Sequence, residues 1–223
     1  MNKLNLANVT VLGESPKRLN TVDKETAKRL KRMPGYDTLR VVLARKVILV
    51  EGPSDEILLK KKYLTLHGVL PEKHGIDIIV VRGIGFRNFL NIGCEVGNQI
   101  HVVKDNDGNY STKVQPLICE YTDYPKIKFF SELDGTLNSL EPALFAVNGN
   151  SEDQLDSYAK IALSPQTYKK YAAEEGIQGK TDFLKDWFKD SGDKKVDSAI
   201  RIFESNDSIL YPPYLENALK FDS

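Results

Sequence analysis

The sequence predicts an α/β fold: a parallel sheet flanked by helices, followed by a C-terminal helical subdomain. Short runs rich in valine and isoleucine lie near residues 46–51, 76–81 and 100–104. Such unbroken apolar runs are typical of strands buried on both faces. Segments with helical periodicity separate these runs, as parallel strands require. From residue 151 onward, the pattern changes to successive helical segments separated by glycine and proline.

The composition indicates an ordinary globular protein and excludes several classes. The chain has 223 residues, 41% hydrophobic and 28% charged. Its 31 basic and 31 acidic residues give a formal net charge of zero, so contact with nucleic acid must come from local basic clusters or bound cations. It has no apolar run near the length of a membrane span and no signal-peptide pattern, so we expect it to be cytoplasmic. Its two cysteines cannot by themselves form a zinc site.

Residues 1–45 are expected to form an irregular and partly helical lead-in. Thr21 or Asp23 would cap a first helix, and residues 37–44 would form a second, short helix. The lead-in has no core of its own, so the chain is expected to be the C-terminal piece of something longer. We expect two further units, at residues 46–149 and 150–223.

The segment from Lys46 to Lys62 organises the chain. Its apolar run predicts a strand, Gly52-Pro53 predicts a turn, and Ser54 or Asp55 would cap the helix that follows. This arrangement places Glu51 and Asp55 at the carboxyl end of a strand, where ligands bind in open α/β sheets. The alternative is a helix-capping aspartate beside a solvated glutamate.

The run near 76–81 predicts a second strand, and residues 86–96 predict a helix that ends at Gly97. The turn between them, Arg82 to Gly85, lacks the full GxGxxG pattern of a phosphate-binding loop. We interpret its glycines as easing a tight turn from strand to helix.

The third strand runs directly into Asp105 and Asp107. If strand geometry persists, both carboxylates point the same way, and two close carboxylates repel unless a cation or proton lies between them. An Asp/Asn/Gly turn is the alternative. An EF-hand calcium loop is excluded, because Val103 and Val114 stand where it requires acids.

Acidic residues therefore follow two predicted strands, Glu51 and Asp55 after one and Asp105 and Asp107 after the other. If those strands are neighbours, four carboxylates converge. Hard cations with oxygen ligands, Mg²⁺ or Mn²⁺, would neutralise that charge.

These motifs together resemble a Toprim domain, the catalytic module of topoisomerases, bacterial primases and some nucleases. The segment VILVEGPSDEILL, followed by VVKDNDGN, is similar to the C-terminal region of OLD-family nucleases (overcoming lysogenization defect), most closely their class 2. The resemblance covers residues 35 to 220. It implies a Toprim-like, Rossmann-like sheet and a metal-dependent DNA endonuclease.

The resemblance also implies roles for particular residues. Residues 137–145 resemble a family segment whose glutamate joins the metal site, which is Glu141 here; without the resemblance, a glutamate at a helix start is the simpler interpretation. Residues 179–183 resemble a segment that supplies a lysine, so Lys180 is expected to neutralise charge on the scissile phosphate or leaving oxygen. The resemblance also implies an alternative role for Glu51 as a general base, as in some other Toprim enzymes.

The rest of the chain completes the predicted fold. Residues 126–130 alternate apolar and basic side chains and predict a fourth strand, and residues 112–121 predict a helix that Pro116 delays or kinks. Later helices are predicted over 152–163, 166–175, 180–189, 194–204 and 212–221.

Two hypotheses for function follow. The first is a DNA endonuclease or nickase in which two divalent ions, Mg²⁺ or Mn²⁺, are held by Glu51, Asp55, Asp105, Asp107 and Glu141. The second is a non-catalytic metal-binding module that mediates contact between proteins. OLD nucleases usually carry an ATPase domain before the Toprim region. No GxxxxGK[ST] loop occurs here, so we expect that domain in a longer parent chain.

Overall fold

The computed structural model describes residues 10–11, 17–18, 35–82, 85–189 and 192–221 of the chain. The predicted helix that would start near Thr21 lies outside these residues. In the described part, no helix is long and apolar enough to cross a membrane.

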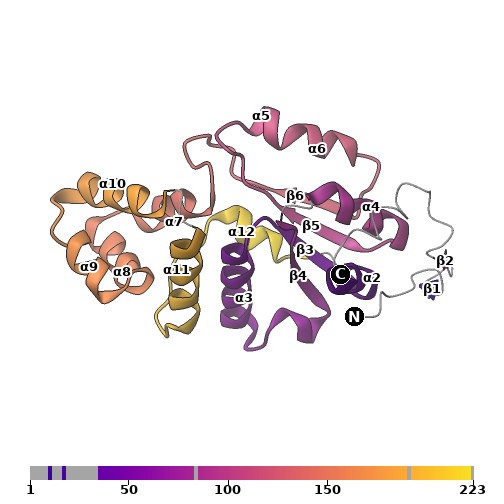
Figure 1. The fold of residues 1–223 in the computed structure, drawn as a ribbon, viewed down its shortest axis with the longest axis horizontal. Coiled ribbons are helices and arrows are strands. Elements are labelled where there is room, and N and C mark those ends of the chain that lie inside the picture. The colour runs from indigo at the N-terminus through magenta and orange to yellow at the C-terminus, as the bar shows by residue number, and fades with distance from the viewer. Residues whose placement is uncertain (1–9, 12–16, 19–34, 83–84, 190–191, 222–223) are drawn as a thin grey trace.

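Four parallel strands form the central sheet in the order β4-β3-β5-β6 (Figure 1). Their bounds are Lys46–Val50 for β3, Ile76–Val80 for β4, Gln99–Val103 for β5 and Ile127–Phe130 for β6. The predicted parallel sheet and its strand positions are therefore confirmed. A separate antiparallel pair is formed by β1 (Thr10–Val11) and β2 (Lys17–Arg18).

Helices connect these strands and then fill the C-terminal part of the chain. The first group comprises α2 (Gly35–Leu43), α3 (Pro53–His67), the 3₁₀ helix η3 (Pro71–His74), α4 (Phe86–Val96), α5 (Tyr110–Lys113), α6 (Gln115–Glu120) and α7 (Leu140–Asn148). The second group comprises α8 (Glu152–Ala162), α9 (Pro165–Tyr171), α10 (Gly176–Phe188), α11 (Gly192–Glu204) and α12 (Pro213–Ala218).

Several of the expected helix boundaries differ in the structure: α9 ends at Tyr171, α10 begins at Gly176, and α12 ends at Ala218. The helix predicted over 112–121 is two short helices, α5 and α6, that meet at Val114. Pro116 lies in the first turn of α6, where its missing N–H costs no hydrogen bond. The helix after β3 begins at Pro53 with Gly52 as its N-cap, so Asp55 lies inside its first turn.

Alternating residues of the sheet pack into two hydrophobic layers, as expected of strands buried on both faces. Ile48 and Val50 face a layer that contains α3 and the later helices. Val47 and Leu49 face a layer that contains α2, α4 and α6. The sheet is thus the middle layer of three.

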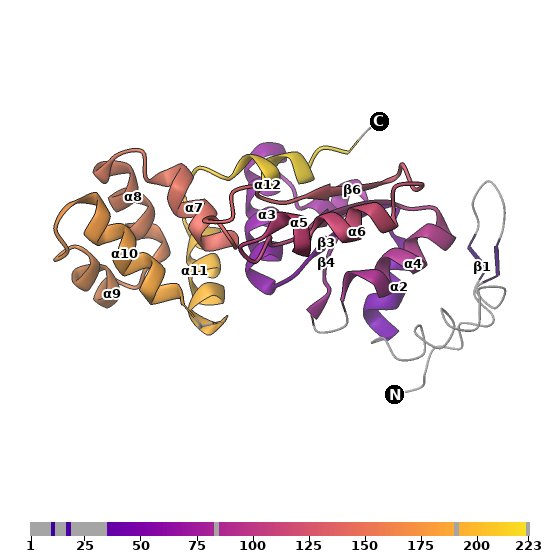
Figure 2. The same ribbon diagram turned by 90° about the horizontal axis from the view of Figure 1, so that it is seen from above.

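The C-terminal helices extend the molecule to one side of the sheet (Figures 1 and 2). Two of them nevertheless return to the α/β part: α11 packs along α3, and α12 packs against β5 and β6. One hydrophobic core runs from the sheet through α3 and α7 into α8, α10, α11 and α12. Through this return, α11 brings its side chains to the carboxyl end of the sheet.

Candidate functional site

Four carboxylates meet at the carboxyl end of the two central strands. Glu51 directly follows β3, Asp55 lies in the first turn of α3, and Asp105 follows β5. Glu141 lies in the first turn of α7. Because β3 and β5 are neighbours, their carboxyl ends bring these acids together. We call Glu51, Asp55, Asp105 and Glu141 the acid cluster.

Asp55 is the most deeply placed aspartate of the cluster. Its side chain is buried, and its Oδ2 accepts a hydrogen bond of 3.0 Å from the backbone N–H of Gly52. Burial raises the pKa of Asp55 to about 7, and the charges of Glu141 and Glu51 act in the same direction. Asp55 is therefore not the N-cap that the sequence predicted, but its side chain accepts from the backbone of the actual N-cap, Gly52, while neighbouring acids repel it.

Asp105 experiences the same repulsion. Burial raises the pKa of Asp105 to about 8, and the charges of Asp55, Glu51 and Glu141 contribute in that order. Lys195 acts in the opposite direction. A carboxyl group held in this way keeps its proton near neutral pH unless a cation replaces it. The cluster is therefore poised to exchange protons for a positive ion.

Two lysines already approach the cluster. The Nζ of Lys104 lies 2.8 Å from Oε1 of Glu51 and 3.9 Å from Oδ2 of Asp107. The Nζ of Lys195, on α11, lies 2.8 Å from Oε2 of the buried Glu141. Two of the four acids are therefore ion-paired with side-chain ammonium groups.

The acids suit a hard divalent cation by their chemistry, since all four offer carboxylate oxygens. Among the described residues, no three His, Cys, Asp or Glu side chains are already grouped to hold an ion. The ion pairs of Glu51 and Glu141 give a physical reason, because each directs a carboxylate toward a lysine. An ion that bound here would have to compete with these contacts.

Asp107 lies at the edge of this arrangement. The strand geometry does not persist to it, because β5 ends at Val103 and Asp107 has a positive φ of 47°. Its side chain is half-exposed, and its Oδ2 lies 3.9 Å from the Lys104 ammonium group. Asp105 and Asp107 are therefore not aligned by strand alternation, and the predicted ligand role of Asp107 stays a prediction.

Asn106, between these aspartates, holds the loop in place. Its buried side chain donates to the carbonyl oxygens of Glu132 (2.8 Å) and Asp134 (2.9 Å) and accepts from the Gly108 N–H (2.8 Å). The loop after β5 is thereby tied to the loop after β6, which leads into α7 and Glu141. One asparagine thus links the segments that carry Asp105 and Glu141.

Lys180, the lysine expected from the sequence, belongs to a different network. Its Nζ donates to Glu152 Oε1 (2.7 Å) and to Asp156 Oδ2 (2.9 Å), and it lies 5.7 Å from the centre of the Tyr171 ring. These partners lie on α8 and α9. The lysine that ion-pairs with the acid cluster from the helical subdomain is Lys195.

Sequence reasoning missed Lys195 and Tyr214. Lys195 is three residues before Ser198 and four before Ala199, both buried, so a lysine on the inner stripe of an amphipathic helix was the available signal. Tyr214 lies at the start of α12, and its side chain is buried there. Burial, followed by the charge of Asp105, raises its pKa well above the ordinary value. Its phenol therefore also neighbours the cluster.

The comparisons with known proteins agree with this architecture. Residues 42–107, which include β3, α3, β4, α4 and β5, match the family model described as "Overcoming lysogenization defect protein-like, TOPRIM domain". This part of the chain therefore resembles the OLD-like Toprim domain. No curated protein matches the chain.

Two solved structures resemble the fold beyond the matched domain. Both are the C-terminal region of the OLD protein of Xanthomonas campestris pv. campestris. The platinum-phased structure has a TM-score of 0.50 at 18% identity and covers 81% of this chain and 92% of its own. The mercury-phased one has a TM-score of 0.48 at 18% identity, over 79% and 93%. The platinum-phased structure supports the arrangement of sheet and helices, and a sequence identity of 18% supports similarity of fold alone.

Proposed function

We propose that this chain is the catalytic part of a divalent-metal-dependent nuclease that hydrolyses phosphodiester bonds in DNA. One observation carries the proposal. A Toprim-type sheet brings four carboxylates together, and burial, followed by repulsion from the neighbouring acids, raises the pKa of Asp55 to about 7 and that of Asp105 to about 8. Clusters of this kind, with strongly shifted pKa values at strand ends, are typical of functional sites.

Asp55, Asp105 and Glu141 would hold the metal, with Glu51 beside them. Mg²⁺ or Mn²⁺ suits these oxygen donors, and the hypothesis drawn from the sequence assumes two such ions. When bound, such an ion supplies positive charge for the attacked phosphate and lowers the pKa of a water molecule. Asp107, at the rim, would complete the ligand set of a second ion.

The chain's own lysines supply further positive charge. The Lys195 ammonium group lies beside Glu141, so it would add positive charge next to a phosphate oxygen bound at the cluster. The sequence-based proposal gave this role to Lys180. The position of Lys195 supports it better, because Lys195 contacts the cluster directly while Lys180 is paired with Glu152 and Asp156.

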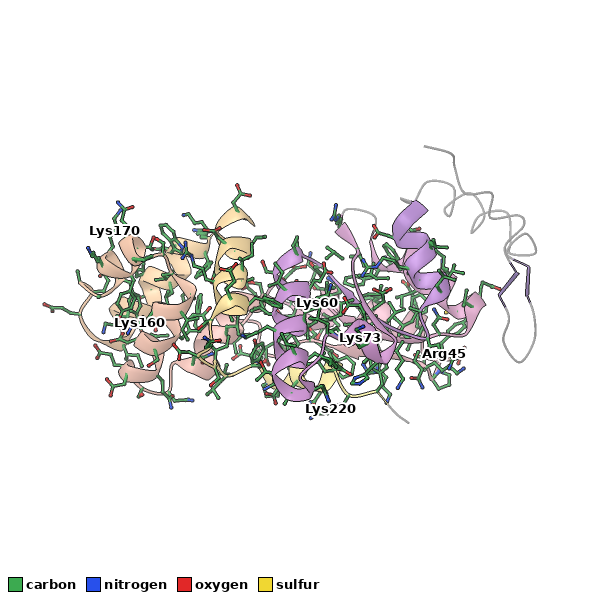
Figure 3. The ribbon with its side chains drawn as sticks, turned by 90° about the horizontal axis from the view of Figure 1, so that it is seen from below. Arg45, Lys60, Lys73, Lys160, Lys170 and Lys220 are labelled. Carbon is green, nitrogen blue, oxygen red and sulfur yellow. The ribbon has the colours of Figure 1, made fainter. Side chains whose placement is uncertain are left out.

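Attraction of DNA would come from the site itself. The basic residues labelled in Figure 3 extend from Lys160 and Lys170 on the helical subdomain to Lys60, Lys73, Arg45 and Lys220 on the α/β part, rather than forming one patch. Lys60 is in addition paired with Glu56 and Glu72. With a net charge of zero, bound cations at the acid cluster would provide the main local attraction for phosphate.

Nicking of supercoiled plasmid tests the proposal. The parent chain is expected to nick in Mg²⁺ or Mn²⁺ and to stop in excess chelator, and Asp105→Asn should remove the activity. Asp123→Asn is the matched control, because Asp123 is exposed in the turn before β6. Equal nicking by the parent and Asp105→Asn would assign the activity to another site or to a contaminant.

A non-catalytic role remains the second candidate, and the two lysine ion pairs favour it. Lys104 and Lys195 neutralise part of the cluster without any metal, as in a purely structural network. In that case the cluster would stabilise the junction between the sheet and the helical subdomain, which would bind a partner protein. Folded parent protein that neither nicks DNA nor binds divalent ions would support this role.

A further inference from the structure

Lys104 is placed where a second cation would otherwise bind. Its ammonium group lies between Glu51, at 2.8 Å, and Asp107, at 3.9 Å. It also donates to the carbonyl oxygen of Asp105, at 3.3 Å. Of the five acids expected to hold metal, Glu51 and Asp107 are the two that Lys104 engages. The other three remain together around Asp55.

The sheet itself fixes this position. In the parallel pairing of β3 and β5, Leu49 is opposite Val102. Continuing that register by two residues places Glu51 opposite Lys104, on the same side of the sheet. The Lys104 N–H also bonds to the Phe130 carbonyl oxygen at 3.1 Å. The backbone of Lys104 is therefore held by the neighbouring strand β6.

The side chain is also confined. It is only 16% exposed, and its Nζ lies 5.8 Å from the centre of the Phe86 ring, a distance at which a cation is attracted to an aromatic face. Removing the ammonium group from Glu51 would leave both charges without a partner in a partly buried place, which is costly. Lys104 is therefore a built-in part of the site.

Charge balance agrees with a single ion. When ionised, the four carboxylates of the acid cluster carry four negative charges. Lys104 and Lys195 supply two positive charges through their ion pairs, and one divalent ion supplies the other two. Asp107 is half-exposed, so solvent screens its charge. A second divalent ion would leave the buried carboxylates with excess positive charge.

We propose that the Lys104 ammonium replaces the second metal ion, so that this chain binds one divalent ion, at Asp55, Asp105 and Glu141. This inference rests on the proposed function and changes its expected two ions to one. An ammonium group donates hydrogen bonds but cannot coordinate water. Lys104 therefore contributes fixed positive charge next to Glu51, and metal-bound water would be available only at the deeper position.

Counting bound Mn²⁺ by calorimetric titration of the chain tests this assignment. The parent is expected to bind one ion. Lys104→Met and Lys104→Gln free Glu51 and Asp107 and are expected to bind two. Lys104→Arg keeps the charge and should bind one. Lys113→Met, which removes an exposed lysine on α5, should also bind one.

The outcomes separate this inference from the proposed function. Two ions in the parent would overturn the role of Lys104 while leaving a metal-dependent nuclease intact. One ion in the parent and still one in both folded Lys104→Met and Lys104→Gln would also overturn it. No ion in the parent would instead remove the metal dependence on which the proposed function relies.

Discussion

At the scale of single residues, the site is defined by charges that the fold forces together. Asp55 and Asp105 lie where burial and neighbouring carboxylates raise their pKa values to about 7 and about 8. These shifts lower the stability of the metal-free protein, because a tenfold change in proton affinity corresponds to about 1.4 kcal/mol. Binding of a positively charged ligand would relieve this repulsion between the carboxylates.

The first prediction concerns pH. Both pKa values lie above the ordinary value of 3.8, so the folded chain binds more protons than the unfolded chain between pH 3.8 and about 8. Stability falls with rising pH wherever the folded state binds more protons. In chelator, the free energy of unfolding should therefore decrease across this window, and urea titrations at several pH values will measure it.

Asp105→Asn provides the comparison for that prediction. It removes one repelled carboxylate, so the loss of stability between pH 5 and pH 8.5 should be smaller than in the parent by on the order of 1–3 kcal/mol. Identical pH profiles for the two proteins would mean that Asp105 is not held under repulsion.

The second prediction distinguishes two lysines. Lys195→Met leaves Glu141 buried without its partner and removes one preorganised positive charge. Nicking should fall on the order of a hundredfold, with a loss of stability of about 1–3 kcal/mol, since Lys195 itself is partly exposed. Lys180→Met, measured beside it, tests the role predicted from the sequence. A hundredfold loss in Lys180→Met with full activity in Lys195→Met would reverse the assignment.

At the scale of elements, the strands and loops align the acids. Glu51 and Asp105 follow β3 and β5, which are adjacent in the sheet. Glu141 reaches them because the loop after β6 is tied to the loop after β5 by Asn106. The acid cluster therefore depends on one buried amide as well as on the sheet.

The third prediction tests this tie. Asn106→Ala leaves two carbonyl oxygens and the Gly108 N–H without their side-chain partner. A buried group left unsatisfied costs about 1–3 kcal/mol, and the affinity for Mn²⁺ should fall because Asp105 and Glu141 are no longer held together. Asn138→Ala is the control, since Asn138 bonds to Asp107 through its backbone carbonyl. Equal metal affinities in both variants would show that Asn106 supports only the loop.

Most strands of the sheet could be predicted from the sequence, but the contacts between side chains of different elements could not. Apolar runs rich in valine and isoleucine indicated three strands of the parallel sheet, alternation of apolar and basic residues indicated the fourth, and the acids that follow two of the strands indicated the site. The pairing of Glu51 with Lys104 depends on strand register, which the runs alone do not determine. Lys195 reaches Glu141 only because α11 packs on α3, a contact between segments far apart in the chain.

At the scale of the whole molecule, the sheet and the C-terminal helices share one hydrophobic core, and the acid cluster lies where they join. Lys195 contacts Glu141 across this junction. An ion bound to the folded state is therefore expected to stabilise the molecule as a whole. The division at residue 150 stays a sequence-based proposal.

The fourth prediction follows from that linkage. An ion that binds only the folded chain adds about 2.7 kcal/mol at a hundred times its dissociation constant, which corresponds to a rise in melting temperature of roughly 5–10 °C for a chain of this size. The Asp105→Ala/Asp107→Ala double variant should lose this rise. If Mn²⁺ stabilises the double variant as much as the parent, the ion binds elsewhere.

A crystal structure of the chain grown with Mn²⁺ would test whether the acid cluster is a divalent metal centre. Anomalous scattering locates the ion without reference to any expected geometry. We predict a single peak among Asp55, Asp105 and Glu141, with Lys104 still paired with Glu51. Well-ordered crystals at neutral pH that show no peak at the cluster, or peaks only at other residues, would contradict a metal centre at the acid cluster.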